Sequence, residues 1–240
     1  MNRGVFAGVV LCAVLATLCM AGEPAPREAV VVVHGLARTS RSMAPMKAAL
    51  EQAGYGVYSL RYPSRKAPVE VLVREHLAPL IAKCQAGHPV KIHFVTHSMG
   101  GILLRQYLAT EPPTNMGRIV MLGTPNHGSE VVDKLGHYTL FEWINGPAGQ
   151  QLGTGTNALP HLLPVPATDV GIIAGTHSIN PILSLMIPGP DDGKVSTGSA
   201  RMEGMKDFSA VPVSHPYLMR DPAVIEMTIR FLKMGVFEGE

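Results

Sequence analysis

Thr96-His97-Ser98-Met99-Gly100-Gly101 is the stretch of the chain that decides the fold. An apolar, β-rich run over 90–95 precedes it, and an amphipathic run over 102–109 follows it. A serine with small residues around it, set between a strand and a helix, is typical of a nucleophile elbow, a tight turn that exposes the hydroxyl at the carboxyl end of the strand. The following helix directs the positive end of its dipole toward the same point. We therefore expect Ser98 to be a nucleophile.

Strand and helix patterns alternate on both sides of this turn. Apolar, often β-branched runs predict buried strands over 29–33, 57–60, 90–95, 118–122 and 170–174. Helical spacing predicts helices over 42–53 and 69–84, a third that ends before Pro112, and a last one that Asp221 caps and that runs to Met234. This alternation predicts an α/β fold: a doubly wound, mostly parallel sheet with helices on both faces and its ligand site at the carboxyl ends of the strands.

Residues 136–166 break this rhythm, because they are rich in glycine and proline and contain the only tryptophan. We expect them to form a short cap or loop insertion beside the site, within a single domain over 22–240. Their apolar side chains fit an acyl pocket and a well-packed loop equally well; these are Phe141, Trp143, Leu159, Leu162 and Leu163.

The composition is that of a globular protein. Of the 240 residues, 46% are hydrophobic and 16% are charged, which allows a large core and excludes a disordered or coiled-coil chain. The net charge of +2 comes without a basic run. The chain therefore lacks the electrostatic footprint of a nucleic-acid-binding protein, and we expect no nucleic-acid partner.

The first residues are typical of an export signal. Arg3 precedes an apolar run over 5–20, and Ala21 and Gly22 supply small residues before a polar segment. We expect a signal peptide over 1–21, cleaved after Ala21. The alternative is an N-terminal membrane anchor, because the run approaches the ~20 residues that span a bilayer. In both cases we expect the protein to work outside the cytoplasm, in the periplasm or as a secreted protein.

The cysteines fit an exported protein. Cys12 and Cys19 lie in the signal segment, and neither follows a glycine or alanine, which argues against a bacterial lipoprotein signal. Cys84 is then alone in the mature chain, so no internal disulfide can form. We expect Cys84 to pack as a small apolar residue.

A serine hydroxyl needs a histidine to take its proton and a carboxylate to orient that histidine. On a fold of this kind the three follow the chain order Ser, Asp or Glu, His. Asp192, in the turn sequence 189–193, suits the acid, and His215 is the only histidine after it. A plain surface turn at this position, Asp191 as the acid and His177 as the base remain alternatives.

The tetrahedral intermediate needs two backbone N–H donors near the nucleophile. Met99, directly after Ser98, supplies one. His34-Gly35-Leu36 follows the first strand, and Gly35 allows close approach of the backbone, so we expect Leu36 to supply the other.

Together these residues resemble the α/β-hydrolase superfamily, in particular its bacterial lipases and esterases, over about 29–234. His34-Gly35-Leu36 is similar to the oxyanion-hole turn of the family, and His97-Ser98-Met99-Gly100-Gly101 is similar to its elbow. The stretch 123–129 resembles the Gly-[Ala/Thr]-Pro-x-x-Gly-Ser segment of many such lipases, which makes His127 part of a motif and not a base. Asp192-Gly193-x-Val195 and Ser214-His215 resemble the loops of the catalytic acid and histidine.

The resemblance implies hydrolysis of carboxylic esters through an acyl-enzyme, without a cofactor and without a metal. Ser98, Asp192 and His215 would be catalytic, Leu36 and Met99 would bind the oxyanion, and four residues would support the site: His34, Gly35, His97 and Gly100. The one departure is Thr96, where the family usually has glycine. The expected partner is a small-molecule ester or a lipid, with a membrane surface as a further candidate. Acyl transfer by the same triad and a non-catalytic envelope protein are the alternative functions.

Overall fold

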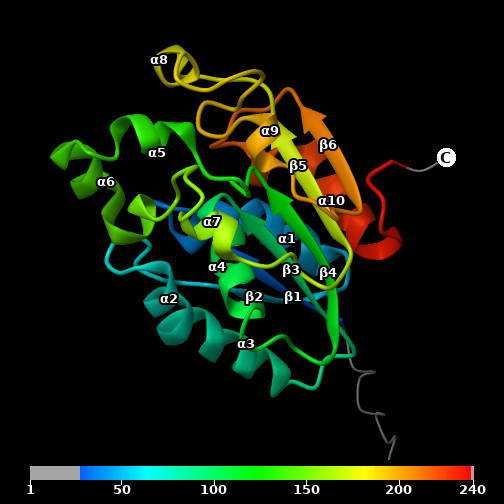
Figure 1. The fold of residues 1–240 in the computed structure, drawn as a ribbon. Coiled ribbons are helices and arrows are strands. Elements are labelled where there is room, and N and C mark those ends of the chain that lie inside the picture. Colours follow the sequence, from blue (N-terminus) through cyan, green and yellow to red (C-terminus); the bar gives the residue numbers. More distant parts are fainter. Residues whose placement is uncertain (1–27, 239–240) are drawn as a thin grey trace, which may run out of the picture.

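The computed structural model describes residues 28–238, whose strands form one six-stranded parallel sheet in the order β2-β1-β3-β4-β5-β6 (Figure 1). The strands are β1 (Ala29–Val33), β2 (Gly56–Ser59), β3 (Ile92–His97), β4 (Met116–Leu122), β5 (Val170–Gly175) and β6 (Asp207–Val211). The strand order reverses between β1 and β3. In open α/β sheets a ligand binds outside the carboxyl ends of the strands at such a switch point. The α/β fold predicted from the sequence is confirmed.

Helices cover both faces of the sheet. The first half of the chain contributes η1 (Ser40–Met43), α1 (Ala44–Gln52), α2 (Val69–Leu72), the π-helical turn η2 (Val73–Leu77), α3 (Ala78–Gln85) and α4 (Met99–Leu108). The second half contributes α5 (Glu130–Leu135), α6 (Thr139–Gln150), α7 (Leu159–Leu162), α8 (Pro181–Ser184), α9 (Thr197–Ala200), η3 (Leu218–Arg220) and α10 (Pro222–Met234).

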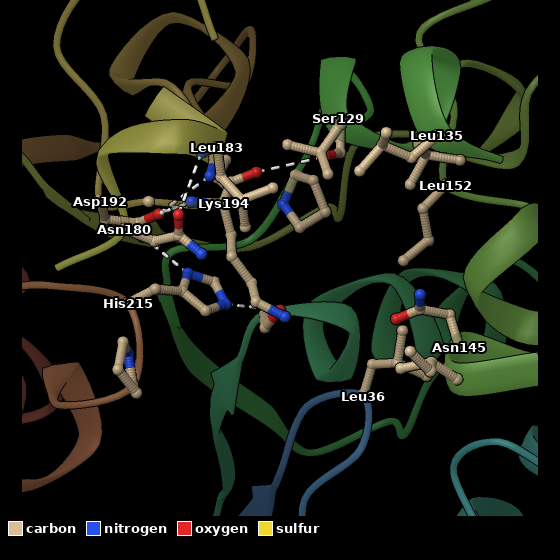
Figure 2. A pocket seen from close by; sticks show the side chains of 18 of the residues that line it. Leu36, Ser129, Leu135, Asn145, Leu152, Asn180, Leu183, Asp192, Lys194 and His215 are labelled. Carbon is tan, nitrogen blue, oxygen red and sulfur yellow. Dashed lines mark hydrogen bonds and ion pairs between the residues drawn. The ribbon is translucent and has the colours of Figure 1, made fainter. Parts of the chain in front are cut away.

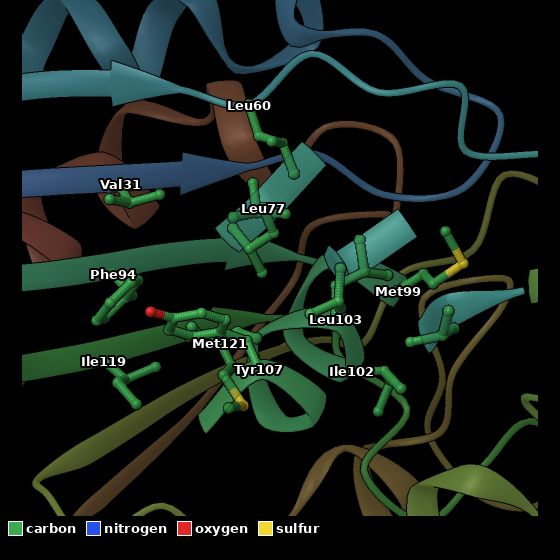
Figure 3. Packing of buried hydrophobic residues seen from close by; sticks show 14 of the residues in the cluster. Val31, Leu60, Leu77, Phe94, Met99, Ile102, Leu103, Tyr107, Ile119 and Met121 are labelled. Carbon is green, nitrogen blue, oxygen red and sulfur yellow. The ribbon is translucent and has the colours of Figure 1, made fainter. Parts of the chain in front are cut away.

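Alternate residues of the central strands supply two separate cores. On one face, α3 and α4 pack against Val31 and Phe94, and Figure 3 shows Leu103 and Tyr107 among these side chains. On the other face, α1 and α10 pack against residues that include Val95. Because both faces are covered, the whole of β1, β3 and β5 is buried, as their continuous apolar runs predict.

The helical stretch predicted over 69–84 forms, with a π-helical turn in its middle. Pro79 is the second residue of α3, two positions after the end of this turn. A proline has no N–H to donate to the preceding helical turn, so one backbone hydrogen bond of the helix is lost there. A π-helical turn accommodates such an interruption locally. Cys84, near the end of the stretch, is fully buried in the apolar core, and burial raises the pKa of its thiol to about 11.

The last helix follows its sequence signals closely. The Asp221 carboxylate accepts hydrogen bonds from the N–H groups of Ala223 and Val224 at 3.0 and 3.1 Å, and Pro222 occupies the first helical position. Both features stabilise a helix start. The segment between β6 and this helix start contains His215.

Residues 136–166, the expected insertion, contain α6 and α7. Figure 1 shows α5, α6 and α8 beyond the sheet, on the side to which the arrowheads of β4 and β5 point. Pro147 lies inside α6, where the helix bends. The insertion therefore lies on the side of the sheet where a ligand would bind.

The N-terminal segment 1–21, with Cys12, Cys19 and the expected cleavage after Ala21, lies outside the described residues. Within 28–238, no helix has the length and apolar character that crossing a membrane requires.

Candidate active site

Ser98 lies in a strained turn between β3 and α4. Its backbone dihedrals are φ 55° and ψ −130°, a conformation that residues with a side chain rarely adopt. The turn is held because the Ser98 N–H donates to Leu122 O of β4 at 2.8 Å and the Gly101 N–H donates to Ser98 O at 3.0 Å. The Ser98 side chain is half-buried. The turn expected from the sequence is thus present.

The backbone around the turn is crowded. A Cβ atom on Gly100 would lie 2.6 Å from Val33 O, which requires glycine at this position of α4. Thr96, where the resemblance expects glycine, is fully buried, and its Oγ1 has no hydrogen-bond partner within 28–238. The turn forms with threonine there, and β3 keeps its pairing through Thr96 with Val33 and Met121.

A chain of hydrogen bonds connects Ser98 to two loops beyond the later strands. Figure 2 shows Asp192 and His215, which these loops contribute. The Ser98 hydroxyl lies 3.0 Å from His215 Nε2, to which it can donate. His215 Nδ1–H donates to Asp192 Oδ2 at 2.7 Å. The other oxygen, Asp192 Oδ1, accepts from the N–H groups of Lys194 and Val195 at 3.0 and 2.9 Å. A carboxylate fixed in this way orients the imidazole and selects the tautomer that can take a proton from Ser98.

The two loops are also tied together through the backbone, because the His215 N–H donates to Asp192 O at 2.9 Å. Asp191, the competing acid, accepts instead from Ser184 Oγ and the Gly193 N–H, both at 2.7 Å. His177, the competing base, is exposed. Of the alternatives left by the sequence, the structure brings Asp192 and His215 to Ser98.

The His34-Gly35-Leu36 turn lies directly against Ser98. A Cβ on Gly35 would lie 2.8 Å from Ser98 Cβ, so only glycine lets this loop approach so closely. Leu36 lies in a turn, and Met99 is the first residue of α4. Within the described residues, no backbone hydrogen bond of a turn or loop uses the N–H group of either residue. Both remain available to an oxygen of a bound molecule.

Tyr62 supports this turn and is a residue that the sequence interpretation missed. Its hydroxyl donates to His34 O at 2.7 Å, and its ring stacks on the His34 ring with 4.3 Å between centroids. Burial raises the pKa of Tyr62 and lowers the pKa of His34, so both side chains are neutral. No local pattern marks Tyr62, because it lies in a loop after β2.

His97 lies directly beneath the hydrogen-bonded chain. Its Nε2–H donates to His215 O at 3.0 Å, and the two rings are 4.7 Å apart. Burial, and then the nearby His215, lower the pKa of His97 well below 6.5, so its ring stays neutral and helps to hold the His215 loop.

Acid should therefore destabilise the protein through His97. The unfolded chain takes up a proton at this position below about pH 6.5 while the folded protein does not, so the free energy of unfolding falls as the pH falls, by up to about 1.4 kcal/mol per pH unit. His97→Gln keeps a donor for His215 O and should lose less stability between about pH 7.5 and about pH 5.5 in urea unfolding. His137→Gln, at an exposed histidine, is the matched control. An equal loss in all three proteins would contradict this role of His97.

A cavity of about 380 Å³ opens over Ser98 and extends beneath α5 and α6. Apolar side chains cover most of its wall, and they come from several elements: Leu36, Val131, Val132, Leu135, Phe141, Ile144, Leu152, Ile179 and Leu183. Of the five apolar insertion residues singled out in the sequence, Phe141 lines the cavity, Trp143 and Leu162 are exposed, and Leu159 and Leu163 pack against the core. Among residues 28–238, no cluster of three or more His, Cys, Asp or Glu side chains could hold a metal ion.

Comparison with known proteins places this geometry in a family. A family model described as "alpha/beta hydrolase fold" matches residues 28–163, more than half of the chain. No curated protein sequence matches the chain. Among solved structures, the mature form of a Bacillus licheniformis lipase is similar with a TM-score of 0.71 and 19% identity, over 90% of this chain and 95% of that one.

Two further solved structures show the same likeness. A metagenomic carboxyl esterase has a TM-score of 0.58 and 20% identity over 82% of this chain and 69% of its own. A Rhodococcus esterase has a TM-score of 0.55 and 16% identity, over 89% of this chain and 92% of its own. At such low identity these structures support the fold alone, and with the family match they lead to one conclusion. The chain belongs to the α/β-hydrolase family.

Proposed function

We propose that this protein is a serine hydrolase that cleaves carboxylic esters with an apolar acyl group. The observation that carries the proposal is the Ser98–His215–Asp192 chain of hydrogen bonds, at 3.0 and 2.7 Å, at the floor of a largely apolar cavity. The proposed roles are nucleophile for Ser98, base and then acid for His215, orienting carboxylate for Asp192, and oxyanion donors for the Leu36 and Met99 N–H groups.

The reaction proceeds in two halves. Ser98 Oγ attacks the carbonyl carbon as its proton passes to His215 Nε2, and the resulting oxyanion accepts hydrogen bonds from the N–H groups of Leu36 and Met99. The C–O bond to the alcohol then breaks, and the alcohol leaves with the proton from His215. A water molecule attacks the acyl-enzyme by the same route, releases the acid and restores Ser98. Because Met99 begins α4, the helix dipole adds to the stabilisation of the oxyanion.

Hydrolysis of 4-nitrophenyl esters of increasing acyl length tests this function. We expect kcat/KM to rise by about 4-fold per methylene until the chain fills the cavity, because each buried methylene contributes about 0.8 kcal/mol. Leu135→Trp, on the cavity wall, should move the optimum to shorter chains, whereas Leu140→Trp, at an exposed position of α6, should not. A sharp preference for acetyl over octanoyl esters would contradict the apolar acyl site. Folded protein that hydrolyses none of the esters would contradict the function itself.

A lipid surface is the partner we propose for the rim of the cavity. Large apolar side chains are exposed on α6 (Leu140, Trp143 and Ile144) and on or beside α8 (Ile179, Ile182 and Leu185). Ile144 and Ile179 also line the cavity, so the exposed apolar surface continues into it. Contact with lipid would bury this surface and bring an ester chain to the opening.

Trp143 reports this contact directly, because it is the only tryptophan and is 77% exposed. We expect its fluorescence to shift to shorter wavelength when phosphatidylcholine vesicles are added. Leu185→Ser should weaken the vesicle binding, whereas Val90→Ser, at an exposed position before the amino-terminal end of β3, should not. An unchanged emission spectrum at saturating lipid would contradict the proposal.

The argument for export rests on the sequence of residues 1–21 alone. On that basis we propose that the protein is periplasmic or secreted. Mass measurement of the mature N-terminus tests it. A chain that begins at Gly22 supports cleavage, and an intact chain recovered from the cytoplasm contradicts export.

A further inference from the structure

Two positively charged side chains, Arg38 and Lys194, line the cavity that contains Ser98. Arg38 follows the proposed oxyanion donor Leu36 by two residues, and Lys194 follows Asp192 by two residues. The loops that build the proposed catalytic centre therefore also carry a cation each. Both residues remain accessible at the rim.

Neither cation has a partner that neutralises it. Within residues 28–238, Arg38 and Lys194 form no ion pair, whereas Arg118, for example, pairs with Asp169. Among the described residues, the only acidic side chain that lines the cavity is Asp192. Its two oxygens are already occupied by His215 and by two backbone N–H groups. The side chains that line the cavity thus carry more positive than negative charge.

The two cations are close enough to act on each other. Partial desolvation in the cavity wall lowers the pKa of Lys194, the Arg38 guanidinium lowers it further, and the Asp192 carboxylate partly opposes both effects. Both cations also contribute to the low pKa of His97 beneath the centre, after burial and His215. An anion bound between Arg38 and Lys194 would remove this repulsion and gain attraction from both.

The cavity has a polar end and an apolar end, which decides where such an anion would lie. Figure 2 shows Lys194 at the same end as His215, and Leu135 and Leu152 at the opposite end. In ester hydrolysis His215 returns its proton to the departing alcohol, so the alcohol part lies on the His215 side. The acyl chain then extends toward the apolar end, and Lys194 faces the alcohol part. Arg38 lines the same cavity and lies close enough to Lys194 and His97 to lower the pKa of both.

We propose that Arg38 and Lys194 form an anion subsite that selects esters whose alcohol part carries a phosphate or carboxylate group. This selectivity rests on the proposed ester hydrolysis. It places anionic lipids and small acidic esters ahead of neutral esters as substrates. Because the contact forms with the substrate and persists in the transition state, its loss should appear mainly in KM.

The test compares matched anionic and neutral esters with the wild type and four variants. The phosphate arm pairs dihexanoylglycerol 3-phosphate with dihexanoylglycerol, and the carboxylate arm pairs 4-butyryloxybenzoate with its methyl ester. The variants are Arg38→Met, Lys194→Met, Lys194→Arg and, as matched control, Lys66→Met at an exposed lysine outside the cavity. The ratio of kcat/KM values within each pair is the readout, so changes in overall activity cancel.

We expect each methionine variant at the subsite to lower the anionic-to-neutral ratio by about 5-fold, the upper range for an accessible ion pair. Lys194→Arg and Lys66→Met should keep the wild-type ratio, and added salt should lower it. The arm with the larger effect identifies the preferred anion. An unchanged ratio in both methionine variants, with neutral esters still hydrolysed, would overturn the subsite and leave the proposed function standing. Folded protein without any ester hydrolysis would overturn both.

Discussion

Ser98→Ala should lower kcat for 4-nitrophenyl butyrate by about 10⁶-fold, because no other group within reach of His215 Nε2 can replace the attacking hydroxyl. The change removes one oxygen from a half-buried side chain, so the fold should persist. The alanine also keeps the β3–α4 turn, since the two hydrogen bonds that hold it come from the backbone. Steady-state kinetics with circular dichroism measures both effects.

The matched control is Ser129→Ala, at a second serine that lines the same cavity. Its hydroxyl donates to Lys194 O at 3.1 Å and is not in contact with His215. We expect this variant to keep kcat within about 10-fold of the wild type. Residual hydrolysis in Ser98→Ala at a tenth of the wild-type rate would show that a different residue attacks the ester.

Asp192→Asn should lower kcat by about 10⁴-fold and change KM little. The amide can present its NH₂ group to His215 Nδ1, which places the ring proton on Nε2 and removes the acceptor that Ser98 needs. The carboxylate also stabilises the imidazolium that forms during the reaction, and the neutral amide cannot do so.

Asp191→Asn is the control for this variant, since the two residues are neighbours in one loop. The Asp191 carboxylate contacts Ser184 and Gly193, so its loss should loosen the loop and cost less than about 10-fold in kcat. Equal losses in the two variants would mean that the loop as a whole, and not the contact of Asp192 with His215, supports activity.

Local patterns were enough to predict the Ser98 turn and the order of the residues around it. The turn depends on neighbours in sequence, namely an apolar strand, a serine and glycines that open a helix. Asp192 could be preferred because it lies in a turn sequence after a late strand, and His215 because it is the only histidine after Asp192. The limits of β3 were less accurate. It ends at His97, two residues beyond the predicted end, because it continues to pair with β4 as far as Leu122.

The features of the site that could not be predicted depend on contacts between distant parts of the chain. Tyr62 supports His34 from another loop, and α8 is too short to show a helical period. Arg38 and Lys194 are 156 positions apart in the chain, and nothing near either residue predicts that they share a cavity. Trp143 illustrates the converse case. Its size suggests a pocket residue, yet it points to solvent because α6 presents Phe141 and Ile144 to the cavity.

The central claim is that Ser98 is an activated nucleophile. Labelling of the purified protein with a fluorophosphonate, followed by peptide mass mapping, tests it most directly, because the probe reacts with a serine that a neighbouring base activates. We predict one adduct per chain, on the peptide that contains Ser98, and its absence from Ser98→Ala. An unlabelled wild-type protein that is folded by circular dichroism, or an adduct on another residue, would contradict this account.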